Sequence, residues 1–303
     1  MSGRARLIVV LVLFVMGVAI AFALMPARPP VKGGRRVPQR IIALAPSHVE
    51  LVFALGCGRR MVGVGDHCVH PPKALDLPRC GGTFDPNYEQ MLALRPDLLV
   101  VQGRAEKADA FCRRYGVPIL RLEIEDLESL YAGTRELGQA LDVEDAAEQL
   151  VAQIQSELDA LRRRVAGEPR PTVFLCLGRR AGSLRTLFSA GGPTFLTEML
   201  DIAGGENVFA DVATRYPTVS KEDLVARGPD WILEIQAGAT LSDAVRRQLA
   251  ADWASLPSLP AVRNDRIRVL TDDHLLLPGP RLPQIAARFA DVLHPAREAP
   301  DGQ

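Results

Sequence analysis

Short apolar runs alternate with amphipathic segments along most of the chain. Runs of four or five residues, bounded by Gly, Pro or polar residues, are typical of strands that are buried on both faces. They predict strands at residues 41–44, 62–65, 98–101, 118–122, 173–177, 231–235 and 267–270. Helical periodicity fills most of the intervals, and strands that alternate with helices form largely parallel sheets.

The longest amphipathic segment runs from Val143 to about Arg164 without a Gly or Pro. Its apolar residues recur at spacings of three and four, which predicts one helix of roughly 30 Å. This segment separates an earlier from a later group of strands. We therefore expect an α/β protein of two Rossmann-like lobes, joined by one long rigid helix, with a ligand cleft between the lobes.

One sequence phrase occurs twice. Glu89 opens Glu-Gln-Met-Leu-Ala-Leu-Arg-Pro-Asp-Leu-Leu-Val, and Glu222 opens Glu-Asp-Leu-Val-Ala-Arg-Gly-Pro-Asp-Trp-Ile-Leu. A second similarity between the two halves is a repeated spacing, since Glu50 lies six residues before Gly56 and Glu198 lies six residues before Gly204. Self-similarity at this distance indicates two related lobes. The matched glutamates Glu89 and Glu222 suggest a partner that contacts both lobes.

The N-terminal segment differs from the rest. Two arginines within the first six residues precede an almost unbroken apolar run from Leu7 to Met25. That is the pattern of a secretory signal peptide, and Ala21-Phe22-Ala23 would suit cleavage. The run is also close to the roughly 20 residues that span a bilayer, so an uncleaved anchor remains an alternative. Positive charge at this end predicts export of the remainder.

These patterns predict the boundaries of five segments. We expect a signal peptide or anchor at 1–25, a linker at 26–37, an N-terminal lobe at 38–141, a connecting helix at 142–168 and a C-terminal lobe at 169–296.

Net charge bears on the kind of partner, and the cysteines bear on possible disulfides. The chain has 36 basic and 36 acidic residues, so no overall basic field favours nucleic acid. Export would place its five cysteines in an oxidising compartment. Cys68 and Cys80 lie in Pro- and Gly-rich loop sequence and are the first choice for a disulfide, worth on the order of 3 kcal/mol. Cys176 lies in an apolar strand and is expected to be a buried thiol.

Ligands of open parallel sheets bind beyond the carboxyl ends of the strands. That rule selects the loops at residues 46–48, 66–87, 178–192, 211–217 and 271–281. His48 could face the cleft, or could be a solvated residue of a first helical turn. His67 and His70 are three residues apart, which is weak evidence for a metal. No convergent cluster of four ligands is evident, so we expect no metal site.

The last of these loops holds several charged residues. Asp272, Asp273, His274 and Arg281 lie in or beside it. Arg281 could bind a carboxylate or phosphate of a ligand, or could lie at a helix end.

Several motifs occur in the order found in one known family. They are Arg40-Ile-Ile-Ala-Leu-Ala-Pro-Ser-His-Val-Glu-Leu, Val62-Gly-Val-Gly, Asn87-Tyr-Glu, the Pro96-Asp97 strand, Gly204-Gly-Glu-Asn-Val and Val219-Ser-Lys-Glu-Asp-Leu. Over residues 38–295 the chain resembles the helical-backbone class of ABC-importer substrate-binding proteins. That class takes up cobalamin, iron-siderophores and haem, and the chain is most similar to the cobalamin-binding branch.

The resemblance implies a monomeric protein in the periplasm or at the outer face of the cytoplasmic membrane. It would capture cobalamin as transported cargo, with no cofactor of its own, and deliver it to the transmembrane subunits of an ABC permease. Haem or a ferric siderophore is the alternative cargo, and His48, His67 or His274 could then ligate haem iron. A membrane-anchored adaptor without a transport role is the alternative from another class.

The resemblance also assigns residues. Glu89 and Glu222 match the glutamates that meet arginines of the permease, although each could simply interact with a helix dipole. Phe84 and Tyr216 match ring positions that contact the macrocycle, and His67 aligns with an aromatic cleft position. Flat aromatic walls suit a large, mostly apolar ligand, but Phe84 and Tyr216 could instead pack on neighbouring prolines.

The motifs of common enzymes are missing from the sequence. There is no Gly-x-Ser-x-Gly elbow, no phosphate loop and no His-Glu-x-x-His. Gly63-x-Gly65 lacks the third glycine of a dinucleotide fingerprint, because Cys68 stands there. We therefore expect a binding protein rather than an enzyme.

Overall fold

The computed structural model describes residues 37–104, 106–180 and 182–295. The chain from Val37 onward forms one compact unit. The predicted signal peptide or anchor and almost all of the predicted linker lie outside the described residues. Within the described ranges, no helix is both long enough and apolar enough to cross a bilayer.

The first lobe is built on a parallel sheet in the order β2-β1-β3-β4. Its strands are β1 (Ile41–Ala43), β2 (Met61–Val64), β3 (Leu98–Gln102) and β4 (Ile119–Leu122). Its helices are α2 (Pro46–Ala54), α3 (Tyr88–Ala93) and α4 (Glu106–Tyr115), with 3-10 turns at Gly58–Arg60 and Pro72–Asp76. The residues of β1 are fully buried, as the unbroken apolar run predicted.

The second lobe repeats this topology with a parallel sheet in the order β11-β10-β5-β8. Its strands are β5 (Thr172–Cys176), β8 (Glu206–Asn207), β10 (Trp231–Ile235) and β11 (Ile267–Leu270). Its helices are α7 (Phe195–Ile202), α8 (Lys221–Arg227), α9 (Asp243–Asp252), α10 (Pro260–Arg263) and α11 (Leu282–Leu293), with a 3-10 turn at Trp253–Ser255. In this repeat α7 corresponds to α2, and α8 corresponds to α3.

A small antiparallel sheet is added to the second lobe. It consists of β6 (Gly178–Arg179), β7 (Leu187–Phe188) and β9 (Thr218–Val219). The buried side chain of Arg179 lies 3.0 Å from Glu234 and 2.8 Å from Asp252, and so ties β6 to β10 and α9. Strands of two residues are too short to show a hydrophobic pattern, and the sequence did not predict this sheet.

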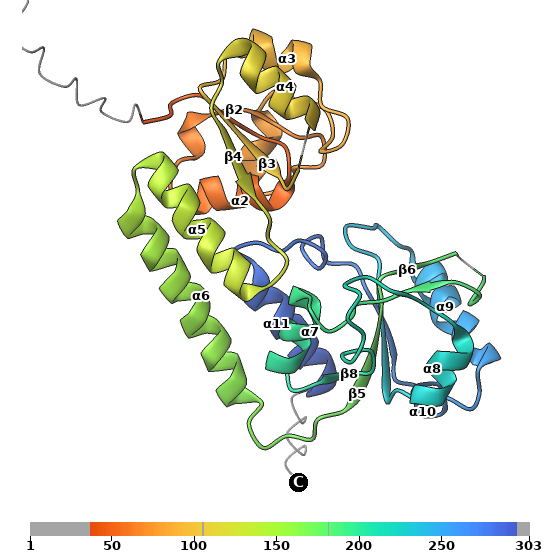
Figure 1. The fold of residues 1–303 in the computed structure, drawn as a ribbon. Helices are drawn as coiled ribbons and strands as arrows, with labels where there is room; N and C mark the ends of the chain where they lie inside the picture. The colour runs from red at the N-terminus through yellow and green to blue at the C-terminus, as the bar shows by residue number, and fades with distance from the viewer. Residues whose placement is uncertain (1–36, 105, 181, 296–303) are drawn as a thin grey trace, which may run out of the picture. The chain divides into compact units, whose positions relative to one another are not determined.

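Two helices follow β4 and lie side by side (Figure 1). They are α5 (Leu127–Leu141) and α6 (Glu144–Arg164). The long helix predicted from periodicity is confirmed as α6, which also packs against α7 and α11 of the second lobe. Helix α5 was not predicted, although it has a complete capping box between Asp126 and Ser129.

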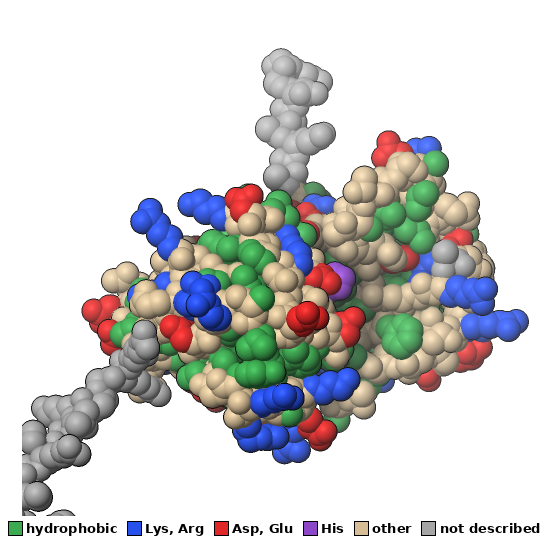
Figure 2. Space-filling view, turned by 90° about the horizontal axis from the view of Figure 1, so that it is seen from above, with side chains coloured by type: hydrophobic (Ala, Val, Ile, Leu, Met, Phe, Trp, Pro, Cys, Tyr) green, Lys and Arg blue, Asp and Glu red, His purple; other side chains and the backbone are tan. Residues whose placement is uncertain are grey.

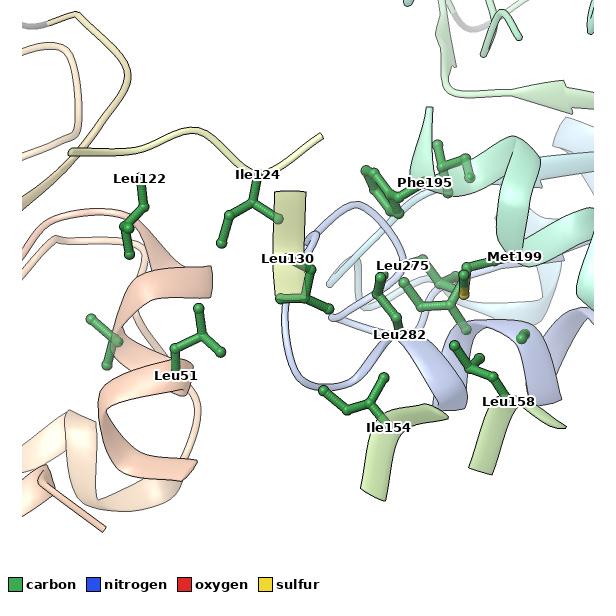
Figure 3. Packing of buried hydrophobic residues seen from close by; sticks show 14 of the residues in the cluster. Leu51, Leu122, Ile124, Leu130, Ile154, Leu158, Phe195, Met199, Leu275 and Leu282 are labelled. Atoms are coloured by element: carbon green, nitrogen blue, oxygen red, sulfur yellow. The ribbon is translucent and has the colours of Figure 1, made fainter. Parts of the chain in front are cut away.

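One hydrophobic cluster runs through both lobes (Figure 3). It includes Leu51 of α2, Leu130 of α5, Ile154 of α6, Phe195 of α7 and Leu282 of α11. Movement of one lobe relative to the other would therefore disturb buried packing, because interiors of this kind are tightly packed.

The structure does not form the predicted Cys68–Cys80 disulfide. All five cysteines lie within the described residues, and all are free and buried. Cys68 packs in the cluster on one face of the first sheet, and Cys80 packs in the cluster on the other face. The prediction was wrong because loop composition does not reveal which face of the sheet a side chain will cover.

Both of these thiols are protonated at neutral pH. Burial raises the pKa of Cys68 to about 12 and that of Cys80 to about 11, and a protonated thiol is a poor nucleophile. Cys176 is a buried thiol in β5, as expected.

Two glycines of α5 provide a matched test of the packing between α5 and α6. A Cβ atom at Gly138 would lie 2.5 Å from the Cβ of Ala147 in α6, whereas at Gly133 the nearest atom, in Ile124, is 3.6 Å away. We expect Gly133→Ala to stabilise the fold by up to about 1 kcal/mol through helix propensity. Gly138→Ala should destabilise it by about 1–3 kcal/mol through overpacking. Urea unfolding measures both changes, and equal effects would contradict this packing.

Candidate functional site

A cavity of about 300 Å³ lies beyond the carboxyl ends of β1 and β3 in the first lobe. Its lining includes Phe84 and Tyr88 from the loop before α3 and the start of that helix. Polar groups come from Gln102 at the end of β3, from Arg104 after it, and from Glu106 and Lys107 at the start of α4. The cavity thus has aromatic walls and a polar rim, as small-molecule sites commonly do.

The ring of Phe84 is 94% exposed at the edge of this cavity. Its loop is held at both ends. The amide of Gly81 donates to Asp66 Oδ1 at 3.1 Å, and Asn87 caps α3 by accepting from the amide of Gln90 at 3.0 Å. An aromatic ring that is almost fully exposed on a tethered loop is suited to packing on the flat face of a ligand.

The histidines of the first lobe lie in three different environments. His67 is exposed, and His70 is partly buried in a separate cavity of about 650 Å³ that is bounded by α2 and α6. His48 is fully buried, beside the backbone of Leu122 but without a hydrogen bond of normal geometry. Burial lowers the pKa of His48 to about 4. Both interpretations of His48 are therefore corrected: it lies neither in a cleft nor in solvent.

Tyr216 lies where the second lobe meets the segment that follows β4. Its hydroxyl donates to Glu125 Oε2 at 3.4 Å, and its side chain is about half exposed. Burial, together with the negative charge of Glu125, raises the pKa of Tyr216 to about 12. The ring therefore remains a neutral donor beside the junction of the two lobes.

Arg281 is already paired within the protein. Its Nε and Nη2 atoms donate to the Glu50 carboxylate at 2.9 and 2.5 Å, and Nη1 donates to Asp273 Oδ1 at 2.9 Å. Burial would lower the pKa of Arg281, but its hydrogen bonds to both carboxylates outweigh burial and raise that pKa. These partners leave the guanidinium little capacity for a ligand carboxylate.

Asp273 and His274 lie beside this arginine in the last cleft loop. His274 Nδ1 is 3.3 Å from Asp273 Oδ1, and the His274 Nε2 atom is buried with no partner among the described residues. Burial alone would raise the pKa of Asp273, but hydrogen bonds from Arg281 and His274 hold it below its ordinary value. Asp273 is thus a charged acceptor that is still 42% exposed.

Glu89 and Glu222 occupy equivalent positions in the repeat. Each is the second residue of its helix, α3 or α8, and each is exposed. Asn87 caps one helix and Ser220 caps the other. The only ion pair of Glu222 within the described residues is to Lys221 at 3.9 Å. Both carboxylates therefore lie at a helix N-terminus, where the dipole stabilises them and where they remain open to a partner.

The structure brings together only part of the predicted set. Phe84 lines the cavity in the first lobe, whereas Tyr216, Asp273, His274 and Arg281 lie on the second lobe. Gln102, Arg104 and Lys107 are not among the residues predicted from the sequence, because the predicted cleft loops did not include the one after β3. The strand-end rule that selected the other loops would have found them.

Charged side chains are dispersed on the face drawn in Figure 2. Basic and acidic side chains lie in several separate groups between hydrophobic ones. No single basic area dominates this view, in keeping with the zero net charge.

Comparisons with known proteins give a consistent result. Residues 41–274 match the family described as periplasmic binding protein. A vitamin B12-binding protein of Vibrio parahaemolyticus is 28% identical over 245 residues, which cover 80% of this chain and 85% of that protein.

Solved structures with a similar fold include two named binding proteins. The periplasmic vitamin B12 binding protein of Vibrio cholerae has a TM-score of 0.68 and 26% identity, covering 84% of this chain and 96% of that one. A periplasmic heme binding protein from Pseudomonas aeruginosa has a TM-score of 0.74 and 30% identity, covering 86% and 95%.

His48 should make stability depend on pH. Its ordinary pKa in the unfolded chain is about 6.5, while the folded value is about 4. Between these values the unfolded state binds more protons, so stability falls as the pH falls. We expect this residue to account for a loss of about 3 kcal/mol between pH 7 and pH 4.

The measurement is urea unfolding of the wild type and His48→Leu at both pH values. The variant should lose less stability on acidification, while the exposed control His67→Leu should behave like the wild type. The same pH dependence in His48→Leu and the wild type would contradict the assignment.

Proposed function

The chain belongs to the periplasmic binding protein family, and from that premise we propose that it is the substrate-binding component of an ABC importer. Its cargo on this proposal is a corrinoid such as cobalamin, which it captures outside the cytoplasm and delivers to a membrane permease. The observation that carries the proposal is the exposed Phe84 ring at the edge of the cavity beyond β1 and β3.

A corrinoid suits the chemistry of this cavity. It is a large macrocycle with an extended face and a rim of amide groups. Phe84 and Tyr88 offer rings to the face, and Gln102 can both donate to and accept from amides at the rim. The relatives named vitamin B12-binding protein support the same cargo.

Haem is the second candidate, and two basic side chains favour it. Arg104 and Lys107 line the cavity together with one acidic residue, Glu106. The two basic side chains could bind the carboxylates of haem. The exposed His67 could ligate the iron, whereas His48 is too deeply buried to do so. The similar heme binding protein supports this alternative.

The remaining assignments belong to the same proposal. Residues 1–25 serve as a signal peptide or as an anchor that holds the protein at the outer face of the membrane. The protein acts as a monomer, and Glu89 and Glu222 contact arginines of the permease. The alternative to the importer proposal is an anchored adaptor that no longer carries a ligand.

Titration of residues 37–303 with cyanocobalamin, haemin and a ferric siderophore tests the cargo, by calorimetry and absorbance. We expect one-to-one binding of cyanocobalamin. Phe84→Ala should weaken it about 20-fold or more, because truncating a central aromatic contact typically costs about 2 kcal/mol. Tyr115→Ala, at the far end of α4, is the control and should bind like the wild type.

Each other outcome has a distinct meaning. A new haem Soret band without corrinoid binding would make haem the cargo. If none of the three compounds binds, the cargo proposal is rejected and the adaptor is favoured.

A charge-reversal variant tests docking. Glu89→Arg combined with Glu222→Arg should leave ligand affinity unchanged, since both side chains are exposed and neither lines the cavity. It should abolish uptake in cells that carry the permease. Glu144→Arg also reverses an exposed first-turn glutamate, in α6, and controls for loss of a helix-dipole interaction. Normal uptake by the double variant, at equal expression, would remove the docking assignment.

A further inference from the structure

Two equivalent glutamates each reach across to the other lobe. Glu50 lies in α2 of the first lobe and binds Arg281, at the start of α11 in the second. Glu198 lies in α7 of the second lobe, and its Oε2 accepts from the amide of Leu127, the first residue of α5, at 2.8 Å. The repeat therefore produces two contacts in which a glutamate of one lobe bonds to the start of the helix that follows the last strand of the other lobe's sheet.

Only the Glu50 contact is connected, through further hydrogen bonds, to the loop at residues 271–281. Arg281 donates to Asp273 at 2.9 Å, and Asp273 in turn contacts His274 at 3.3 Å. We call Glu50, Arg281 and Asp273 the inter-lobe clamp. It connects α2 of the first lobe, through one guanidinium group, to two candidate ligand-binding residues of the second.

The geometry of the clamp limits movement. Glu50 is 4% exposed and Arg281 9% exposed, and their two hydrogen bonds fix the orientation of the planar guanidinium group. The neighbouring chain is also close, since a Cβ atom at Gly279 would lie 3.5 Å from Ser47 Cβ. A small shift of α2 would therefore be transmitted to Arg281 rather than absorbed by loose packing.

We propose that Glu50 is a positioning residue for ligand binding, although it lies on the other lobe from the residues that it positions. By orienting Arg281, Glu50 fixes the positions of Asp273 and His274 in the loop that follows β11. This inference rests on the proposed function and extends it, because it adds Asp273 and His274, which the sequence predicted as ligand-binding residues, to the groups that contact the cargo. Loss of the Glu50 charge frees Arg281 to rotate towards Asp273. The loop that carries Asp273 and His274 is then no longer bonded to the first lobe through Arg281.

Glu198 provides the matched control, since it makes the equivalent contact and has no link to Asp273. The variants Glu50→Gln and Glu198→Gln, in residues 37–303, are compared by three measurements. These are the unfolding midpoint, the NMR signals of the His274 ring, and affinity for cyanocobalamin and haemin. The chain has only five histidines, so individual ring signals can be assigned.

We expect Glu50→Gln to lower the unfolding midpoint, whereas Glu198→Gln should lower it little, because the glutamine carbonyl can still accept from the amide of Leu127. Only Glu50→Gln should shift and broaden the His274 ring signals and weaken binding, by about tenfold, a typical effect of a residue that acts through a contact network. A wild-type affinity and unchanged ring signals in Glu50→Gln would overturn the inference.

A charge swap distinguishes two roles of Glu50. This residue could position the loop that carries Asp273, or it could only hold the two lobes together. Glu50→Arg combined with Arg281→Glu restores an ion pair between α2 and α11 but places a carboxylate beside Asp273. We expect the unfolding midpoint to recover, while affinity and the His274 signals do not. Recovery of both would overturn the inference, because the pair would then only hold the lobes together. If the wild type binds neither compound, the cargo proposal fails, and the His274 signals still decide whether Glu50 positions this loop.

Discussion

The continuous hydrophobic cluster that joins the lobes is the constraint on which the rest of the structure depends. It passes from α2 through β4 and α5 to α6, α7 and α11. Separating the lobes would return this apolar surface to water, at about 25 cal/mol for each Å² exposed. The same packing leaves Glu50 only 4% and Arg281 only 9% exposed, at the wall of the cavity that contains His70. A buried pair of this kind remains favourable only while its hydrogen-bond geometry is kept. The core thus holds both the sheets and the ionic contact between them.

Some of the predicted ligand-binding side chains serve the fold, and others remain available to a ligand. Arg281 and His48 were candidates to face a ligand, yet Arg281 is paired with Glu50 at the start of α11 and His48 is an uncharged residue of the interior. Phe84 has the opposite character, since nothing in the fold covers its ring. The cavity beside Phe84 combines this open aromatic ring with amide, basic and acidic groups, a combination that suits recognition of a ligand.

Prediction failed where local sequence carried no sufficient signal. Helix α5 has apolar residues at helical spacing, but Gly133 and Gly138 lower its helix propensity, and only contact with α6 explains why Gly138 is needed. The strands β6, β7 and β9 have two residues each, which is less than one period of a hydrophobic pattern. Cys68 and Cys80 shared a loop composition that favoured a disulfide, yet the sheet separates the two thiols into different clusters.

The sequence alone determined the features that depend on neighbouring residues. These include the buried parallel strands, the long helix α6, and the capped helices that present Glu89 and Glu222 at equivalent positions. Apolar runs, periodicity and capping residues act over a few positions, so a single sequence reveals them. Tertiary structure alone decided which polar side chains meet. Glu50 and Arg281 are separated by 231 positions, and only the packing of two sheets around a shared core brings them together.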